Sequence, residues 1–96
     1  MRLVYHPAVQ KDVNSILNYY DRVSPELADE FWDEFSRVIE FIASNPQRGH
    51  PVRAALFRVN LQRFPYHVLF RRRPMTIRII LVRHNKRHPK LGTSRR

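Results

Sequence analysis

Histidines and arginines alternate with apolar residues in the second half of the chain, a pattern that suits phosphate chemistry. His67 and Arg71 share one face of a predicted strand. Arg58 and Arg78 lie within two neighbouring predicted strands. Arginine stabilises an anionic transition state, and histidine transfers protons near neutral pH. Such residues fit either metal-free cleavage of RNA, in which the 2′-hydroxyl is the nucleophile, or a surface that only binds anions.

The composition excludes several other chemistries. There is no cysteine and there are only two glycines, so neither a thiolate site nor a glycine-rich phosphate loop can form. No aspartate or glutamate follows Glu40, so the second half supplies no carboxylate for general-base catalysis or for a hydrolytic metal site. We therefore expect neither a metal nor a small-molecule cofactor.

The charges are divided unequally along the chain. All eight Asp and Glu residues lie within residues 1–40, together with only four of the 18 Lys and Arg residues. The remaining 14 cationic side chains lie within residues 41–96, where no acidic side chain balances them. A surface of one sign attracts an anionic partner, such as a nucleic acid or an acidic protein segment. A membrane is the least favoured partner, because the basic part is predicted to be sheet rather than an amphipathic helix.

Length and hydrophobicity indicate one globular domain spanning residues 1–96. The hydrophobic content of 43% is ordinary for a folded protein. The N-terminus lacks the apolar core of a secretory signal, and the longest apolar runs have four residues. We therefore expect no membrane-spanning segment and a cytoplasmic location.

Two helices are predicted in the acidic part. Apolar residues recur at three- and four-residue spacing over residues 8–22, which indicates one helical face. A second helix begins after Ser24, because a hydroxyl N-cap followed by proline favours helix initiation. It ends before Pro46, since the residue preceding a proline avoids the helical region. The short connection makes the two helices an antiparallel hairpin.

Strands are predicted on both sides of this hairpin. A short first strand over residues 2–6 is closed by Pro7, and a loop over residues 47–51 follows the second helix. Three later strands cover residues 56–61, 64–72 and 76–84. The order β-α-α-β-β-β predicts an α+β fold in which the helical hairpin packs on one face of a small, mostly antiparallel sheet.

The last predicted strand is apolar on both faces. Alternation places Ile80 and Val82 on one face and Ile79 and Leu81 on the other. This pattern indicates a central strand, or a strand whose second face is partly covered. The face of the sheet away from the helices is then expected to carry most of the basic residues.

These features together resemble the RelE/ParE superfamily of bacterial toxins from type II toxin–antitoxin systems. The similarity covers nearly the whole chain. The segments that carry it are Tyr5-His6-Pro7-Ala8, Asn45-Pro46-x-x-Gly49, Phe64-Pro65-Tyr66-His67-Val68-Leu69-Phe70 and Ile80-Leu81-Val82-Arg83-His84-Asn85-Lys86-Arg87-His88-Pro89. The resemblance implies a β-α-α-β-β-β toxin that is neutralised by a cognate acidic antitoxin.

The superfamily has two branches with different activities. RelE-like members cleave mRNA on the ribosome without a metal, using basic residues and often a tyrosine near the C-terminal end. ParE-like members inhibit DNA gyrase. Compared with RelE, the chain has His67 where a strand arginine is expected and Asn60 where a lysine is expected, and no tyrosine follows Tyr66. The Phe64-Pro65-Tyr66 and His84-x-x-Arg87-x-Pro89 segments are more similar to ParE.

We therefore expect a ParE-like toxin that inhibits growth by binding DNA gyrase, as in plasmid stabilization systems. The alternative is a RelE-like mRNA interferase, a ribosome-dependent endoribonuclease, and a further alternative is a non-toxic nucleic-acid-binding module. Only the nuclease alternative assigns catalytic roles, which fall on His67, His84 and Arg87. The residues predicted to bind the anionic target are Arg58, Arg71, Arg78, Arg83, Lys86 and His88.

Overall fold

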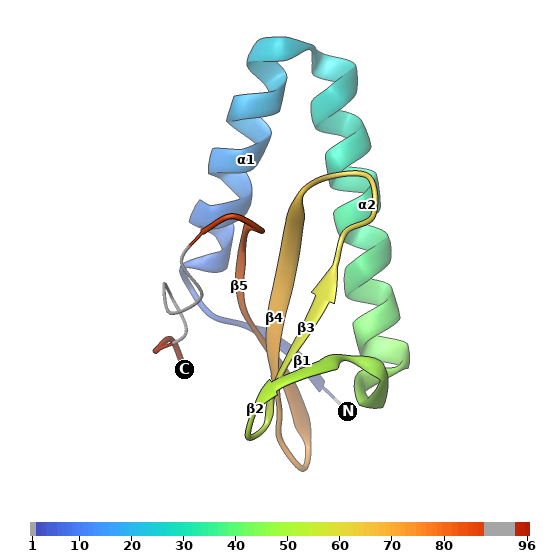
Figure 1. Ribbon diagram of the computed structural model, residues 1–96, viewed down its shortest axis with the longest axis vertical. Helices are drawn as coiled ribbons and strands as arrows, with labels where there is room; N and C mark the ends of the chain where they lie inside the picture. Colours follow the sequence, from blue (N-terminus) through green and yellow to red (C-terminus); the bar gives the residue numbers. More distant parts are fainter. Residues whose placement is uncertain (1, 88–93) are drawn as a thin grey trace.

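Two helices and a five-stranded sheet make up the part of the chain that the computed structural model describes, residues 2–87 and 94–96 (Figure 1). The elements are β1 (Arg2–Tyr5), α1 (Val9–Val23), α2 (Pro25–Ser44), a 3-10 helix (Pro46–Arg48), β2 (His50–Arg53), β3 (Leu56–Asn60), β4 (Tyr66–Arg72) and β5 (Thr76–His84). The predicted α+β fold and the order of its main elements are confirmed. β2 was missed, because a four-residue edge strand containing Pro51 resembles a loop in sequence.

The helical hairpin is fixed by the signals that predict it. The side-chain oxygen of Ser24 accepts a hydrogen bond from the backbone N–H of Leu27 at 3.1 Å, and Pro25 occupies the first turn of α2. The apolar faces of both helices are buried toward the sheet. Within residues 2–87 and 94–96, no helix combines the length and the hydrophobicity needed to cross a membrane.

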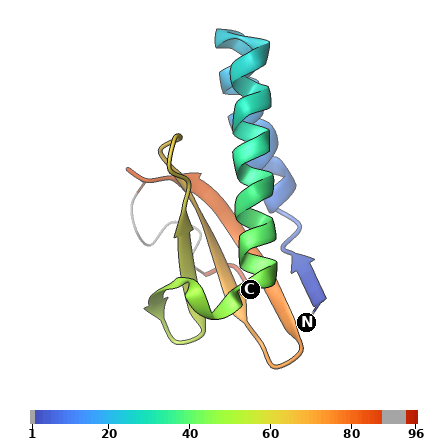
Figure 2. The same ribbon diagram turned by 90° about the vertical axis from the view of Figure 1, so that its right-hand side faces the viewer.

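The sheet has the strand order β1-β5-β4-β3-β2. β1 pairs with β5 in parallel, and the other three pairings are antiparallel. Figure 2 shows α1 and α2 on one side of the sheet, so neither of them covers the opposite side. We call these the helix side and the outer face. The predicted alternation of β4 is confirmed, with Val68 and Phe70 in the main core on the helix side.

A β-bulge in β5 changes the predicted alternation of that strand. Leu69 of β4 pairs with Leu81 and the next residue, Phe70, pairs with Ile79, so Ile80 is an extra residue. Leu81 consequently joins Ile80 and Leu69 in a second small cluster, while Val82 lies in the main core. The predicted faces of Leu81 and Val82 were therefore wrong, because a bulge shifts the phase of all residues beyond it.

Gly49 allows the chain to pass closely over the main core after α2. A Cβ atom at this position would lie 2.6 Å from Cζ of Phe70 and 2.9 Å from Cβ of Phe57. Only glycine fits at these distances without a shift of the aromatic rings. The segment Asn45-Pro46-x-x-Gly49 thus connects the end of α2 to the start of β2 within five residues.

Candidate functional site

The outer face brings together the strand arginines that the sequence predicts to bind an anion. At one end of the face, strand pairing places His67 between Asn60 and Arg83. At the other end, Arg71 is directly opposite Arg78. The row between these ends consists of Arg58, Leu69 and Leu81. Strict alternation would put Arg78 and Arg83 on opposite faces, so the bulge in β5 is what unites them.

His67 is the centre of a polar network at its end of the outer face. Its side chain is buried, with a relative exposure of 1%, and Nδ1 lies 2.8 Å from Oδ1 of Asn85. Nε of Arg83 donates to Nε2 of His67 at 2.9 Å, so Nδ1 carries the ring proton and donates it to Asn85. Nε of Arg58 donates to Oδ1 of Asn60 at 2.7 Å, and its Nη2 lies 3.5 Å from the same oxygen of Asn85.

The environment of His67 keeps its imidazole neutral. Burial lowers the pKa of His67 to about 4; the charges of Arg58 and Arg83 act in the same direction, and the hydrogen bond to Asn85 opposes them. Burial also lowers the pKa of the Arg83 guanidinium, with a further contribution from Arg58. At neutral pH both ring nitrogens of His67 are thus engaged in hydrogen bonds, and the ring positions its neighbours.

His84 lies on the other side of the sheet from His67, because it is opposite Tyr66 in the pairing of β4 with β5. The ring of His84 packs edge-on against that of Tyr66 with centroids 5.1 Å apart, and its Nδ1 accepts the backbone N–H of Lys86 at 3.0 Å. Burial raises the pKa of the Tyr66 phenol. His84 and Arg87 share a groove with Tyr66. The structure thus brings His84 and Arg87 together in the groove, whereas His67 is linked to that groove only through Arg83, which lines it.

The far end of the outer face gathers further positive charge. Burial lowers the pKa of the Arg71 guanidinium, and the charges of three other arginines lower it further. These are Arg73, Arg53 and Arg96. The opposing Arg78 has a buried Nε without a hydrogen-bond partner among the residues that the structure describes. This end therefore concentrates positive charge where no Asp or Glu of residues 41–96 can balance it.

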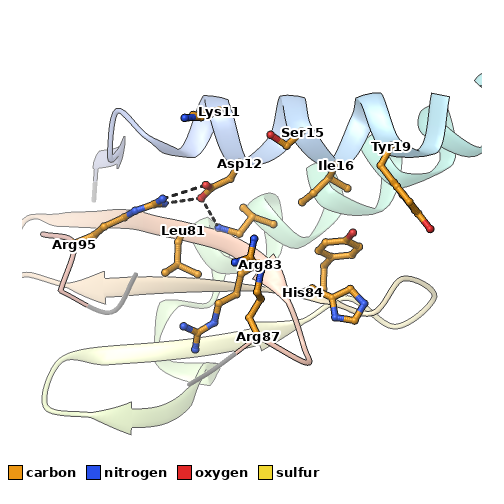
Figure 3. A pocket seen from close by; sticks show the side chains of 12 residues that line it. Lys11, Asp12, Ser15, Ile16, Tyr19, Leu81, Arg83, His84, Arg87 and Arg95 are labelled. Atoms are coloured by element: carbon orange, nitrogen blue, oxygen red, sulfur yellow. Dashed lines mark hydrogen bonds and ion pairs between the residues drawn. The ribbon is translucent and has the colours of Figure 1, made fainter. Parts of the chain in front are cut away.

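A groove of about 540 Å³ runs between α1 and the edge of β5 (Figure 3). It forms because β1 pairs with β5 only as far as Ile79, and no other strand of residues 2–87 and 94–96 continues along that edge. Aromatic and cationic side chains line it together. They are Tyr19, Tyr66 and His84, with Lys11, Arg83, Arg87 and Arg95.

Asp12 closes one end of this groove by linking α1, β5 and the C-terminal residues. Its Oδ2 accepts the backbone N–H of Val82 at 3.1 Å and Nη1 of Arg95 at 2.6 Å (Figure 3). Nη2 of Arg95 donates to the other carboxylate oxygen at 3.2 Å. Nη2 of Arg71 in turn donates to the carbonyl of Arg95 at 3.2 Å. One acidic side chain thus satisfies an edge-strand N–H and holds a terminal arginine.

Sequence reasoning missed Asp12 and Asn85 as parts of these sites. Asp12 pairs with a residue 83 positions away, which no local pattern can reveal. Its spacing of four from the buried Ile16 was the available signal, because it places the carboxylate beside the apolar stripe of α1. Asn85 directly follows β5, and an amide just after a strand of arginines was the corresponding signal there.

The remaining predicted residues lie beyond the end of β5. Lys86 is exposed, and His88 lies outside the described residues. Within the described part of the chain, no three His, Cys, Asp or Glu residues are grouped so that they could hold a metal ion.

The fold and its two unlike faces define a small α+β domain with a helical hairpin on one side of a mixed sheet and an arginine-rich surface on the other. The sequence family described as "ParE toxin of type II toxin-antitoxin system, parDE" matches residues 3–89. The chain belongs to this ParE toxin family, which confirms the resemblance and its ParE-like branch.

A solved structure shares this architecture. A chain from the chromosomal ParDE TA system of P. aeruginosa superimposes with a TM-score of 0.77 at 18% identity, covering 88% of this chain and 95% of that one. At this identity the likeness establishes the fold. No curated protein sequence matches significantly.

Proposed function

We propose that the protein inhibits growth by binding DNA gyrase in the cytoplasm and that an acidic antitoxin neutralises it. Family membership supports the toxin assignment. The observation that favours gyrase binding over mRNA cleavage is the state of His67, which is buried and hydrogen-bonded through both ring nitrogens. A general base must reach the proton that it removes, and His67 offers a substrate no such access. The outer face is therefore assigned a binding role.

We assign the antitoxin to the groove between α1 and β5. A carboxylate-bearing segment would meet the cations of Lys11 and Arg87 there, and the rings of Tyr19 and Tyr66 would supply apolar contact. Among the described residues, β5 has no neighbouring strand on this edge beyond Ile79, and an antitoxin segment that adds as a strand there would replace Asp12 at the N–H of Val82 and Arg95 at the carbonyl of Ile80. Asp12 is the one acidic residue that lines the groove among the described residues, and it is already paired with Arg95, so little negative charge remains there to repel such a partner.

Induced expression in bacteria tests the gyrase assignment. Plasmid supercoiling and the 5′ ends of cellular mRNA are followed in the same cultures, with uninduced cells as the reference. We expect growth arrest with relaxed or linearised plasmid and unchanged mRNA ends. New mRNA ends within codons, with supercoiling untouched, would overturn the assignment and favour the endoribonuclease, with His84 and Arg87 as the residues to examine.

The antitoxin assignment is tested with variants of the groove. Lys11→Glu with Arg87→Glu reverses two charges that line the groove. We expect the cognate antitoxin to bind this variant at least tenfold more weakly than wild type, while Arg22→Glu with Arg37→Glu, on exposed helix positions, has a smaller effect. Equal weakening by both pairs would show that only net charge matters and would remove the groove from the proposal.

A further inference from the structure

The described residues of the outer face expose none of the apolar features that protein partners and single-stranded nucleic acids use. Its aliphatic residues Leu56, Leu69, Ile80 and Leu81 have relative exposures of 0–2%. The aromatic rings of β3 and β4, including Phe57 and Phe70, belong to the main core on the helix side. Protein interfaces depend on buried apolar anchors, and single strands stack on exposed rings. What the outer face offers a ligand is therefore charge.

Two of its arginines are held in fixed orientations. Nε of Arg83 is bound to His67, and Nε of Arg58 is bound to Asn60, so the plane of each guanidinium is set by the protein. The two groups are tied to each other through Asn85, whose Oδ1 contacts both His67 and Arg58. A fixed guanidinium binds a phosphate with less loss of side-chain entropy than a mobile one.

The positive surface extends beyond this pair. Arg78 and Arg83 are opposite Arg71 and His67, which are four residues apart on β4, so at a rise of about 3.3 Å per residue the two arginines are roughly 13 Å apart along the sheet. Duplex DNA carries one charge per roughly 1.7 Å of its axis, so a surface of this length meets several phosphates.

We propose that the outer face binds the phosphate backbone of duplex DNA, with Arg58 and Arg83 as fixed contacts and His67 as the residue that positions Arg83. This inference rests on the proposed function in one respect, because the DNA in question is the segment that gyrase holds. The toxin then contacts enzyme and DNA together. His67 acts through Arg83 and touches no phosphate itself.

The first part of the test measures binding of the full chain to a short labelled DNA duplex by fluorescence anisotropy over a series of salt concentrations, without gyrase. The logarithm of the binding constant falls with the logarithm of salt by about 0.9 per phosphate contact. Arg58→Gln with Arg83→Gln is expected to reduce this slope by about two. The matched pair Arg22→Gln with Arg37→Gln, exposed on the helices, removes the same charge and is expected to leave the slope unchanged.

The second part separates positioning from charge. His67→Gln leaves the net charge unchanged at neutral pH, because His67 is neutral there. We expect it to reduce the slope by about one and to weaken binding several-fold, since Arg83 loses its fixed orientation. Because His67 is buried, Asn85→Ala serves as a second variant: Asn85 is exposed, so the fold should tolerate the change. Circular dichroism verifies the fold of each variant.

Three results would overturn the inference. Equal slopes for the outer-face pair and the helix pair would mean that binding follows net charge alone. If His67→Gln and Asn85→Ala are folded and bind the duplex as the wild-type protein does, His67 does not position Arg83. Tighter binding of a polyglutamate peptide than of the duplex would make the ligand an acidic protein segment. Gyrase inhibition by the wild-type protein is measured separately, so failure of the proposed function would be seen independently of these results.

Discussion

The two faces of the sheet are formed by the same strands but have different roles. On the helix side, Phe70 and Val68 are fully buried against residues of both helices. On the outer face, the buried aliphatic cluster has four residues, and arginines surround it. The helix side supplies the apolar burial that stabilises the fold. The outer face carries like charges that a fold selected for stability alone would avoid.

The pairing of Arg71 with Arg78 shows this difference most directly. Two cations directly opposite each other on neighbouring strands destabilise a sheet. In the described part of the chain, no strand pairing on the helix side places two cations opposite each other, and some acidic side chains there fasten elements together. Both carboxylate oxygens of Glu34, for example, accept backbone N–H groups of the β3–β4 loop, from Gln62 and Arg63. We therefore expect mutations on the helix side to change the free energy of unfolding more than mutations on the outer face.

The largest loss of stability is expected from a truncation on the helix side. Phe70→Ala removes a fully buried ring that packs against Phe57 and Gly49, and it should lower the free energy of unfolding by about 3–5 kcal/mol. Urea unfolding followed by circular dichroism measures this change. A loss below about 1 kcal/mol would mean that the helix side is not the main source of stability.

Acidification is expected to destabilise the fold through His67. Its pKa is about 4 in the folded protein and near 6.5 when unfolded, so the unfolded state binds more protons between these values. The contribution is complete above about pH 6.5 and is lost as the pH falls toward 4, by about 3 kcal/mol at most. Unfolding measured from pH 7 to pH 4 tests this. His67→Gln, which does not titrate, should show a correspondingly flatter profile, and identical profiles would contradict the assignment.

A smaller loss is expected from Asp12→Asn. This change keeps the size of the side chain but removes the charge that holds Arg95 and weakens the acceptor for the N–H of Val82. The free energy of unfolding should fall by about 1–2 kcal/mol. Asp21→Asn, on an exposed position of α1, is the matched control and should change it by less than about 0.5 kcal/mol. Equal effects at both positions would show that the link to Arg95 contributes nothing.

The smallest effect is expected on the outer face itself. Arg78→Gln relieves the repulsion with Arg71, so thermal unfolding should show a change within about 0.5 kcal/mol, in the stabilising direction. A clear destabilisation would mean that Arg78 supports the fold, and the contrast between the two faces would then be weaker than proposed.

Much of the architecture could be predicted because its signals are local. Ser24 and Pro25 start α2 through contacts within one turn, and alternation over residues 66–72 assigns the faces of β4 correctly. The bulge at Ile80 could not be predicted, because an extra apolar residue in an apolar strand does not alter the sequence pattern in a recognisable way. It nevertheless decides that Arg83 joins the outer face.

The candidate site was predicted in part for the same reason. Alternation placed His67 and Arg71 on one strand face, where they lie. The burial of His67 and its bonds to Arg83 and Asn85 depend on the register between β4 and β5, which the sequence does not specify. In the sequence, a histidine among arginines suggests a catalytic role. In the structure, the ring is neutral and hydrogen-bonded through both nitrogens, which favours a positioning role.

Inhibition of purified gyrase tests the central contrast between the two faces most directly. Supercoiling of relaxed plasmid is measured with the wild-type protein, with Arg58→Gln plus Arg83→Gln on the outer face, and with Arg22→Gln plus Arg37→Gln on the helices. We predict that the wild-type protein and the helix pair inhibit supercoiling alike, while the outer-face pair inhibits at least tenfold less. No inhibition by the wild-type protein, or equal inhibition by both pairs, would contradict the assignment of the outer face to target binding.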